Sequence, residues 1–281
     1  MKFGIHLSTY TKSWSDDIFQ FLEKSKEYGY DGVEFPLMDP INFDVKKANA
    51  LLEKYNMECT CGTSLNTTKD ISSLNKIARY EGINHLKKCI DICNELETDC
   101  LGGVLYTPWG YHISRKDAKE NIKFMLENLN VVGNYAKNKN VVLALEVLNR
   151  YETYVLNTIE EGKDYLKKIN NENIKLHFDT FHANIEEKSL NSAIKLGGND
   201  IYHIHFCEND RGIPGTGNID WEGVKDGLLS INYDRWITIE NFVMPNCEVG
   251  RETFVWRNIN SSKDDVAKAG IKFMKNLFYS K

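Results

Sequence analysis

The chain has 281 residues, of which 42% are hydrophobic, and its formal net charge at pH 7 is −5. This length suits one large α/β barrel or two smaller domains, and the apolar fraction is sufficient for a substantial core. Lysine and arginine are interspersed with acids and form no basic stripe, which disfavours a nucleic-acid partner.

The N-terminal residues lack the apolar core of a signal peptide, and no apolar run approaches the length that spans a membrane. We therefore expect a cytoplasmic protein without a membrane partner. The seven cysteines are odd in number and include no Cys-x-x-Cys pair, so we expect most of them to be reduced core residues.

Eight short apolar segments rich in β-branched residues recur along the chain, and segments with helical spacing lie between them. The strand-like segments begin at residue 3 (FGIHLS), 31 (DGVEFP), 58 (ECTCGTS), 99 (DCLGGVLY), 141 (VVLALEVL), 174 (IKLHFDTF), 201 (IYHIHFCE) and 235 (RWITIENF). Helical spacing is clear from residue 18 (IFQFLEKSKEYG), from 84 (NHLKKCIDICNEL) and from 264 (DDVAKAGIKFMKNLFYS).

This alternation of strands and helices indicates a parallel sheet, and eight strands are the number that closes a (β/α)8 barrel of about 250 residues. The last helix would cover the final strand. No low-complexity linker divides the chain. We therefore predict an α/β protein with one domain over residues 1–281, a (β/α)8 TIM barrel, with a doubly wound open sheet as the alternative.

Polar residues stand at the predicted ends of the last four strands, where barrel enzymes carry their chemistry. These residues are Glu146, Asp179, His205 and Glu240. Strand alternation gives each the same facing as the residue two positions earlier, so all four side chains would point to one place on the barrel axis. Three carboxylates there would repel one another and be costly to desolvate, and a divalent cation resolves that conflict.

The oxygen-rich set with one imidazole suits Mn²⁺, Mg²⁺ or Co²⁺ better than a thiolate-preferring zinc site, and Mn²⁺ is our first choice. Any single member could instead be a helix cap or a surface acid, as Asp179 before its helical stretch illustrates. Four successive strands that end alike favour the metal site. His177 and His203, one layer deeper, are expected to fill the barrel or to orient carboxylates rather than to bind the metal.

Four segments of the chain resemble the D-tagatose 3-epimerase and D-allulose (psicose) 3-epimerase family of xylose-isomerase-like barrels. They are LEVLNRYETYVLNT, DTFHANIEE, HFCENDRGIPGTGNIDW and IENF. The resemblance runs from the first strand to VWRNIN near the C-terminus. It implies one divalent metal, usually Mn²⁺ or Co²⁺, held by Glu146, Asp179, His205 and Glu240. It also implies that the C1 to C3 end of the substrate is bound by Glu152, His182 and Arg211.

Epimerising a ketose at C3 requires removal of a proton beside the C2 carbonyl and return of a proton to the opposite face. A free carboxylate is too weak a base for that carbon acid unless the developing enediolate is stabilised, as a metal and hydrogen-bond donors can do. The resemblance implies that Glu146 and Glu240 are the two catalytic acid/base residues, and their strand positions permit it.

Aromatic side chains near the strand ends could stack on a sugar or pack under loops. Those we considered are Trp14, Tyr106, Trp109 and Phe242. The residues that we predict to complete the substrate site are His6, Trp14, Gly62 and Trp109. The family often carries tyrosine where this chain has His6, and a Gly-x-Gly turn where it reads GTSLN around Gly62. The preferred ketose therefore stays open among D-fructose/D-allulose, D-tagatose/D-sorbose and ribulose/xylulose pairs.

No cluster of lysine or arginine at the strand ends demands a phosphate, which favours free sugars as substrates. Glu34, at the end of the second strand, could contact substrate or pair with a nearby cation, and is a weaker candidate. The resemblance also implies a homo-oligomer, because family members are commonly dimers or tetramers.

Three other functions compete with an epimerase. An aldose–ketose isomerase or a hydroxypyruvate isomerase uses the same barrel and similar chemistry. Related barrels include endonucleases, which need several metals, a histidine-rich ligand set and a basic cleft, whereas this chain has seven histidines and an acidic balance. A non-enzymatic metal-binding or sugar-binding protein is the third alternative.

Overall fold

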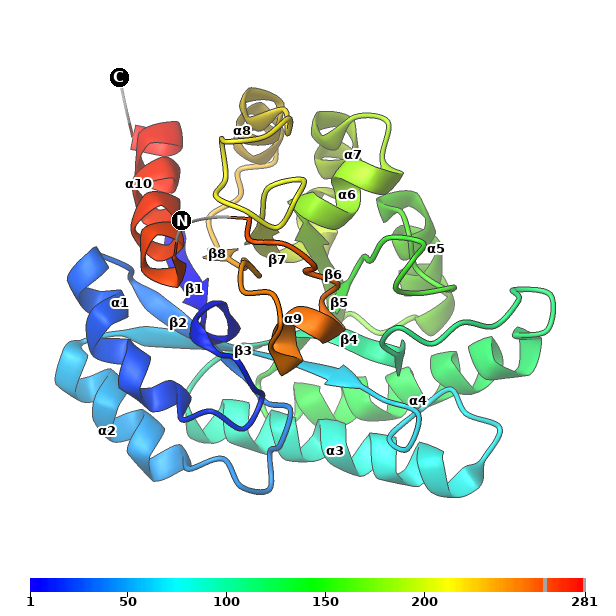
Figure 1. The fold of residues 1–281 in the computed structure, drawn as a ribbon. Coiled ribbons are helices and arrows are strands. Elements are labelled where there is room, and N and C mark those ends of the chain that lie inside the picture. The colour runs from blue at the N-terminus through cyan, green and yellow to red at the C-terminus, as the bar shows by residue number, and fades with distance from the viewer. Residues whose placement is uncertain (260–261, 280–281) are drawn as a thin grey trace.

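The computed structural model describes residues 1–259 and 262–279. Eight parallel strands follow one another in chain order around a closed barrel, and the first strand pairs with the last (Figure 1). They are β1 (Lys2–His6), β2 (Gly32–Pro36), β3 (Glu58–Leu65), β4 (Cys100–Pro108), β5 (Val142–Glu146), β6 (Ile174–Asp179), β7 (Ile201–Phe206) and β8 (Trp236–Ile239). The closed, single-domain barrel is confirmed, and the open sheet is excluded.

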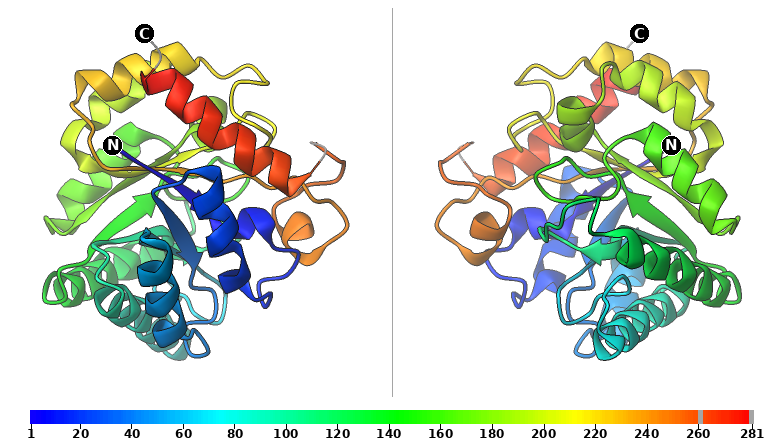
Figure 2. Two further views of the ribbon diagram at one scale, coloured as in Figure 1. Left: turned by 90° about the vertical axis from the view of Figure 1, so that its left-hand side faces the viewer. Right: turned by 90° about the vertical axis from the view of Figure 1, so that its right-hand side faces the viewer.

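Helices surround the barrel on the outside (Figure 2). The α-helices are α1 (Leu22–Tyr28), α2 (Val45–Tyr55), α3 (Lys76–Glu95), α4 (Lys119–Lys137), α5 (Ile159–Ile169), α6 (Thr180–Glu186), α7 (Leu190–Gly197), α8 (Trp221–Ser230), α9 (Glu248–Glu252) and α10 (Lys263–Tyr279). Short 3-10 helices are η1 (Leu7–Tyr10), η2 (Ile18–Phe21) and η3 (Gly198–Asp200). Helix α10 packs against β8, β1, α1 and α8 and so covers the final strand, as predicted.

Two of the predicted helices differ in their bounds from the observed ones. The segment from residue 18 splits into η2 and α1, and the segment from residue 84 is the second half of the longer α3. The predicted C-terminal helix reaches Ser280, which lies outside the described residues. Several helices begin where the sequence supplies a polar cap, since the side chains of Thr158, Ser189 and Asp220 accept hydrogen bonds from backbone N–H groups of the first turn.

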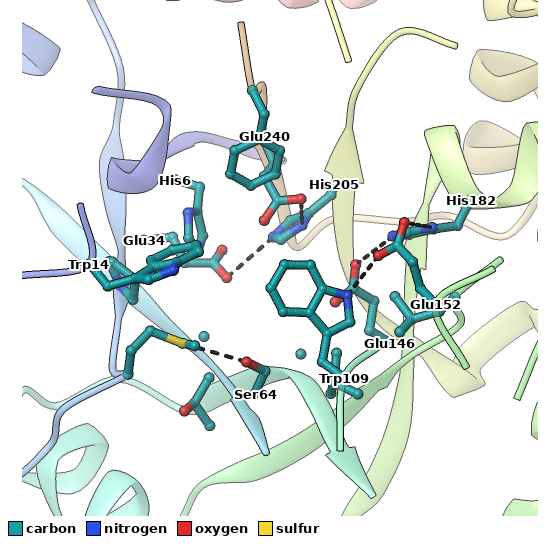
Figure 3. A pocket seen from close by; sticks show the side chains of 18 of the residues that line it. His6, Trp14, Glu34, Ser64, Trp109, Glu146, Glu152, His182, His205 and Glu240 are labelled. Atoms are coloured by element: carbon teal, nitrogen blue, oxygen red, sulfur yellow. Dashed lines mark hydrogen bonds and ion pairs between the residues drawn. The ribbon is translucent and has the colours of Figure 1, made fainter. Parts of the chain in front are cut away.

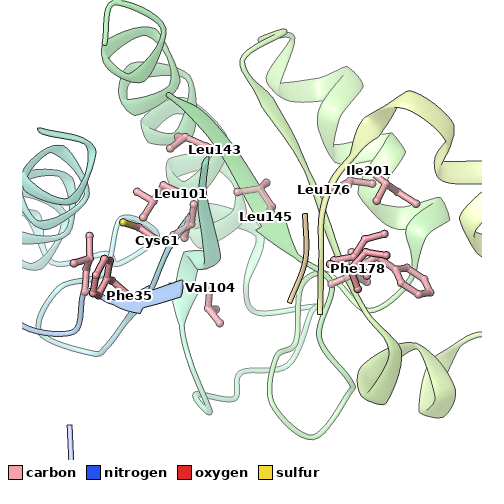
Figure 4. Close-up of a cluster of buried hydrophobic side chains, with 14 of the residues drawn as sticks. Phe35, Cys61, Leu101, Val104, Leu143, Leu145, Leu176, Phe178 and Ile201 are labelled. Carbon is pink, nitrogen blue, oxygen red and sulfur yellow. The ribbon is translucent and has the colours of Figure 1, made fainter. Parts of the chain in front are cut away.

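Apolar side chains of the strands point outward and are buried against the helices. Leu143 and Leu145 on β5 and Leu176 and Phe178 on β6 belong to this layer (Figure 4). The residues that alternate with these along each strand face the barrel interior, which holds small residues and polar side chains. A Cβ on Gly102, for example, would lie 3.2 Å from Nδ1 of His177. Small residues on the early strands therefore leave room for the larger polar side chains of the later ones.

All seven cysteines are free thiols, and six of them are buried, as expected for reduced core residues. Within residues 1–259 and 262–279, no helix combines the length and the apolar character needed to cross a membrane.

Candidate functional site

A cavity of about 560 Å³, its open mouth included, lies at the carboxyl ends of the strands (Figure 3). The predicted site residues that line it are His6, Trp14, Gly62, Trp109, Glu146, Glu152, His182, His205, Arg211 and Glu240. Asp179 is not part of the lining but is buried beside it and reaches the same cluster of polar atoms. The fold thus brings all the predicted site residues together.

The four predicted metal ligands converge at one point. Glu146, Asp179 and His205 end or nearly end their strands, and Glu240 directly follows β8. One potential ligand atom from each lies within 4.8 Å of those of the other three. Ligands on opposite sides of a divalent cation are about 4–5 Å apart, because metal–oxygen bonds measure about 2.0–2.6 Å. The cluster has the spacing of a single-cation site.

Asp179 is both a helix cap and a member of this cluster. Its Oδ1 accepts hydrogen bonds from the backbone N–H groups of Phe181 (2.6 Å) and His182 (3.2 Å), which begin α6. Its buried Oδ2 has no hydrogen-bond partner in the described part of the chain and lies 3.9 Å from Nδ1 of His205, which also has none. Buried polar atoms without partners are costly, so this pair of atoms fits a bound cation.

The protein alone does not balance the charges in the cluster. Burial, and then repulsion from Glu240 and Asp179, raises the pKa of Glu146 well above its ordinary value. Burial also opposes ionisation of Glu240, but His205 and Arg211 outweigh it and lower the pKa of Glu240. A divalent cation would neutralise the repulsion that raises the pKa of Glu146.

His182 lines the cavity and turns its Nε2 toward Glu146 and Arg211. Its Nδ1 accepts a hydrogen bond from the backbone N–H of Asn149 (3.2 Å), and its Nε2 lies 3.3 Å from Nη2 of Arg211, a group that can only donate. Burial lowers the pKa of His182, which favours the neutral form of the ring. Nε2 lies 3.5 Å from Oε1 of Glu146. This nitrogen therefore lies between Arg211 and Glu146, where the carboxylate cluster opens to the cavity.

Glu152 is held as a hydrogen-bond acceptor next to His182. Its carboxylate accepts from Nε1 of Trp109 (2.7 Å) and from Nδ2 of Asn149 (2.9 Å). Burial opposes its ionisation, but the nearby His182 and Arg211 and these two hydrogen bonds outweigh burial and lower the pKa of Glu152. Asn149 was missed in the sequence, where a single amide in a polar loop carries no signal, yet it positions both Glu152 and His182.

Arg211 completes this side of the cavity from a strained backbone. Its φ is +69°, a left-handed conformation that non-glycine residues rarely adopt. The guanidinium carbon lies 3.9 Å from the ring centroid of Phe181, and Nη1 lies 3.2 Å from Oε2 of Glu240. The backbone carbonyl of Arg211 accepts from the backbone N–H of Phe242 (3.3 Å). These contacts hold the strained backbone of Arg211 in place and direct its guanidinium into the cavity.

The loop that carries Arg211 is fastened by the buried carboxylate of Glu208. This carboxylate accepts hydrogen bonds from the backbone N–H groups of Gly215 (2.8 Å) and Ile219 (3.1 Å) and from Nε1 of Trp221 (2.9 Å). Gly215 has φ +87°, and a Cβ on Gly217 would lie 2.6 Å from Oε1 of Glu208. These glycines let the loop close around the carboxylate.

Replacing Glu208 with glutamine is expected to loosen this loop. The glutamine amide turns an N–H group toward the N–H donors of the loop, so hydrogen bonds to a charged acceptor are lost. We expect the free energy of unfolding to fall by about 2–4 kcal/mol. Thermal unfolding measures that loss. We also expect kcat/KM to fall about ten- to a hundredfold, because Arg211 is no longer held in place. Glu222→Gln, an exposed position on α8, is the matched control, and equal stability of the two variants would contradict the prediction.

His6, Trp14 and Glu34 lie on the other side of the cavity (Figure 3). The backbone N–H of Ser8 donates to Nδ1 of His6 at 3.3 Å, so Nε2 of the neutral ring carries a proton. Burial lowers the pKa of His6, which favours the neutral form. A Cβ on Gly62 would lie 2.9 Å from Oε1 of Glu34 and 3.4 Å from this Nε2, so the glycine leaves room for the Glu34 carboxylate.

Aromatic residues form the mouth of the cavity. Nε1 of Trp14 donates to Glu252 on α9 at 2.6 Å, and Trp14 packs on the apolar cluster around Phe242. Tyr106, in contrast, does not line the cavity. It is buried within β4, which extends two residues further than predicted, and its hydroxyl donates to the backbone carbonyl of Glu146 (2.9 Å).

Comparison with known proteins agrees with this geometry. Residues 22–277 match the family model described as xylose isomerase-like TIM barrel. The D-psicose 3-epimerase of Enterocloster bolteae is 31% identical over 99% of this chain and 96% of the relative. The L-ribulose 3-epimerase of Methylomonas sp. is 30% identical over 99% and 98% of the two chains.

Solved structures of similar enzymes share the whole fold. A D-allulose 3-epimerase from Methylomonas sp. in complex with D-allulose superposes with a TM-score of 0.92 at 31% identity, covering 99% of this chain and 97% of that one. A D-psicose 3-epimerase in the presence of D-fructose gives a TM-score of 0.93 at 27% identity, covering 99% of each chain. The chain therefore belongs to the ketose 3-epimerases of the xylose isomerase-like TIM barrel family and is an isomerase.

Proposed function

We propose that this protein interconverts free ketohexoses at C3, of the D-fructose/D-allulose or D-tagatose/D-sorbose type, with one divalent cation per subunit. The observation that carries the proposal is the convergence of Glu146 and Glu240, whose carboxylates offer oxygens within 4.8 Å of each other in the lining of the cavity. The ketoses named for similar structures, D-allulose, D-fructose and D-tagatose, support this substrate class.

The residues that would hold the cation are Glu146, Asp179, His205 and Glu240. Three carboxylates and one imidazole suit Mn²⁺ first and Co²⁺ or Mg²⁺ next. When bound, the cation supplies Lewis-acid polarisation of the ketose oxygens at C2 and C3. Oδ2 of Asp179 and Nδ1 of His205, which make no hydrogen bond in the described part of the chain, support this site.

Glu146 and Glu240 would carry the protons. They come from β5 and from the end of β8, so they approach the cavity from different parts of the barrel wall. One carboxylate removes the C3 proton and the other returns a proton to the opposite face, through an enediolate of the sugar. The two residues exchange roles when the reaction runs in reverse, because the substrate and the product differ only at C3.

The substrate would be oriented by groups on both sides of the cavity. His182 and Arg211 donate hydrogen bonds to the oxygens that gain negative charge, and each well-placed donor contributes about 3 kcal/mol to the barrier reduction. Glu152 accepts a hydrogen bond from a hydroxyl near C1. On the other side, the N–H of His6 is a donor for a distal hydroxyl, where Trp14, Gly62 and Trp109 shape the space.

Exchange of the C3 hydrogen with solvent tests the proposal. We expect the Mn²⁺-loaded protein, incubated with D-fructose in deuterated water, to form D-allulose and to place deuterium at C3 of both sugars. Mass spectrometry and NMR of the recovered sugars locate the label. A parallel panel with D-tagatose and D-ribulose ranks the substrates.

Two of the competing functions, an isomerase and a binding protein, give different results in this experiment. Deuterium at C1 with formation of an aldose would indicate an aldose–ketose isomerase. Sugar binding without any exchange would indicate a binding protein. A cytoplasmic location and a homodimer or homotetramer stay predictions from the sequence.

A further inference from the structure

Glu34 is a buried carboxylate whose two oxygens both face imidazole rings. Its Oε2 lies 2.6 Å from Nε2 of His203, and its Oε1 lies 3.2 Å from Nε2 of His205. Thr60 donates its hydroxyl hydrogen to Oε2 at 2.9 Å. Within residues 1–259 and 262–279, the ion pairs of Glu34 are with these two histidines alone. This buried carboxylate at the edge of the cavity therefore has partners at both of its oxygens.

The contact with Glu34 determines which nitrogen of His205 carries hydrogen. An ionised carboxylate can only accept hydrogen bonds, so Nε2 of His205 must be the donor. In the neutral ring, Nδ1 then holds a free lone pair. This Nδ1 lies 3.5 Å from Oε2 of Glu240 and 3.9 Å from Oδ2 of Asp179. Glu34 thus turns the lone pair of His205 into the carboxylate cluster.

We propose that Glu34 is a positioning residue that fixes the ring orientation and tautomer of His205 for cation binding. This inference rests on the proposed function, because it assumes that the cluster holds a divalent cation. Histidine ligands of metal sites commonly donate their second N–H to a carboxylate, and loss of that partner weakens metal affinity about 10- to 100-fold. Glu34 itself stays outside the predicted ligand set.

The surroundings of Glu34 hold it in this position. Its strand, β2, is not a neighbour of β7 in the barrel, so the side chain reaches His205 across the interior. His203 and Thr60 fasten the oxygen that His205 does not use. The ring of His177 packs edge-on against His205, with ring centroids 4.0 Å apart. His205 is therefore fixed on one side by a hydrogen bond and on another by an aromatic contact.

Two substitutions at Glu34 separate its geometry from its charge. Glu34→Asp keeps the negative charge but shortens the side chain, and Glu34→Gln keeps the length but offers an N–H group to one histidine. We expect both to weaken Mn²⁺ binding about 10- to 100-fold, measured without sugar by calorimetry or by the electron paramagnetic resonance signal of free Mn²⁺. Thr60→Val removes the third hydrogen bond to the same carboxylate and should change the affinity less than about threefold. Melting curves of the metal-free proteins establish that each variant is folded.

The outcomes distinguish this inference from the proposed function. Mn²⁺ affinities of both Glu34 variants equal to that of the unmodified protein would overturn the assignment, and a raised KM for the ketose alone would make Glu34 a substrate contact instead. Absence of Mn²⁺ binding to the unmodified protein would overturn both the assignment and the proposed cation.

The tautomer of His205 can also be measured in the unmodified protein, so this test does not depend on the folding of a variant. Long-range ¹H–¹⁵N NMR spectra of the Mg²⁺-loaded protein report which nitrogen of each histidine carries hydrogen. We expect His205 to be protonated at Nε2 and bare at Nδ1. Protonation at Nδ1 would overturn the assignment.

Discussion

Replacing Glu240 with glutamine is expected to lower kcat at least about a thousandfold while the ketose still binds. Glutamine keeps the size of the side chain but cannot accept or return the C3 proton, and a positioned acid or base typically contributes about 10²- to 10⁴-fold to the rate. Glu240 also belongs to the cation cluster, so part of the loss would come from weaker metal binding. Deuterium exchange at C3, assayed at saturating Mn²⁺, measures the effect.

Two comparisons make this result specific to proton transfer. Glu222→Gln carries the same chemical change at an exposed position of α8 and should keep full activity. Glu146→Gln should lose exchange to a similar degree, because the proposed scheme needs both carboxylates. Full turnover in either site variant would contradict the two-base assignment. If a variant binds less sugar but exchanges the C3 hydrogen of each bound sugar at the normal rate, the replaced residue binds the substrate and does not transfer the proton.

The sequence predicted the parts of the site that depend on local strand geometry. The strands fix which side chains face inward, so the ends of β5 to β8 placed Glu146, Asp179, His205 and Glu240 in one cluster without any knowledge of the loops. The alternatives for Asp179, helix cap or ligand, were not exclusive, since its two oxygens face different groups.

The contacts that the sequence did not predict cross the barrel or depend on loop closure. Glu34 meets His205 from a strand that is not its neighbour, which periodicity along one strand cannot indicate. Asn149 gains its role only because the loop after β5 folds back on Glu152. Tyr106 was considered for the sugar site because β4 was predicted to end two residues too early. These contacts depend on three-dimensional closure, so a sequence pattern carries little signal for them.

Removal of the divalent cation is expected to abolish turnover, and Mn²⁺ should restore it. Without the cation, burial and repulsion raise the pKa of Glu146, which favours its protonated form over the base, and the Lewis-acid polarisation of the ketose oxygens is lost. Saturating Mn²⁺, at about 100 times its dissociation constant, adds about 2.7 kcal/mol to the stability of the folded state. That gain should raise the melting temperature by about 5–10 °C.

The sign of the pH dependence follows from the same groups. Burial opposes protonation of His205, but Glu240 and Glu34 outweigh it, so the pKa of His205 is raised, as is that of Glu146. A cation must displace protons from both groups, so its affinity is highest above their raised pKa values and falls as the pH drops through them. Calorimetry in buffers of different ionisation enthalpy counts the released protons, and proton-neutral binding would contradict this account.

Asp179→Asn tests the cation site while keeping the helix. Asparagine is a good N-cap, so its Oδ1 can still accept from the backbone N–H groups that begin α6. Its amide N–H₂ then faces the cluster where Oδ2 stood and repels a cation. We expect the variant to remain folded but to recover less than about 1% of the activity at Mn²⁺ concentrations that saturate the unmodified protein. Asp220→Asn makes the same change at the N-cap of α8, away from the cluster, and should keep full activity. Equal metal-dependent activity in the two variants would show that Asp179 is not a ligand.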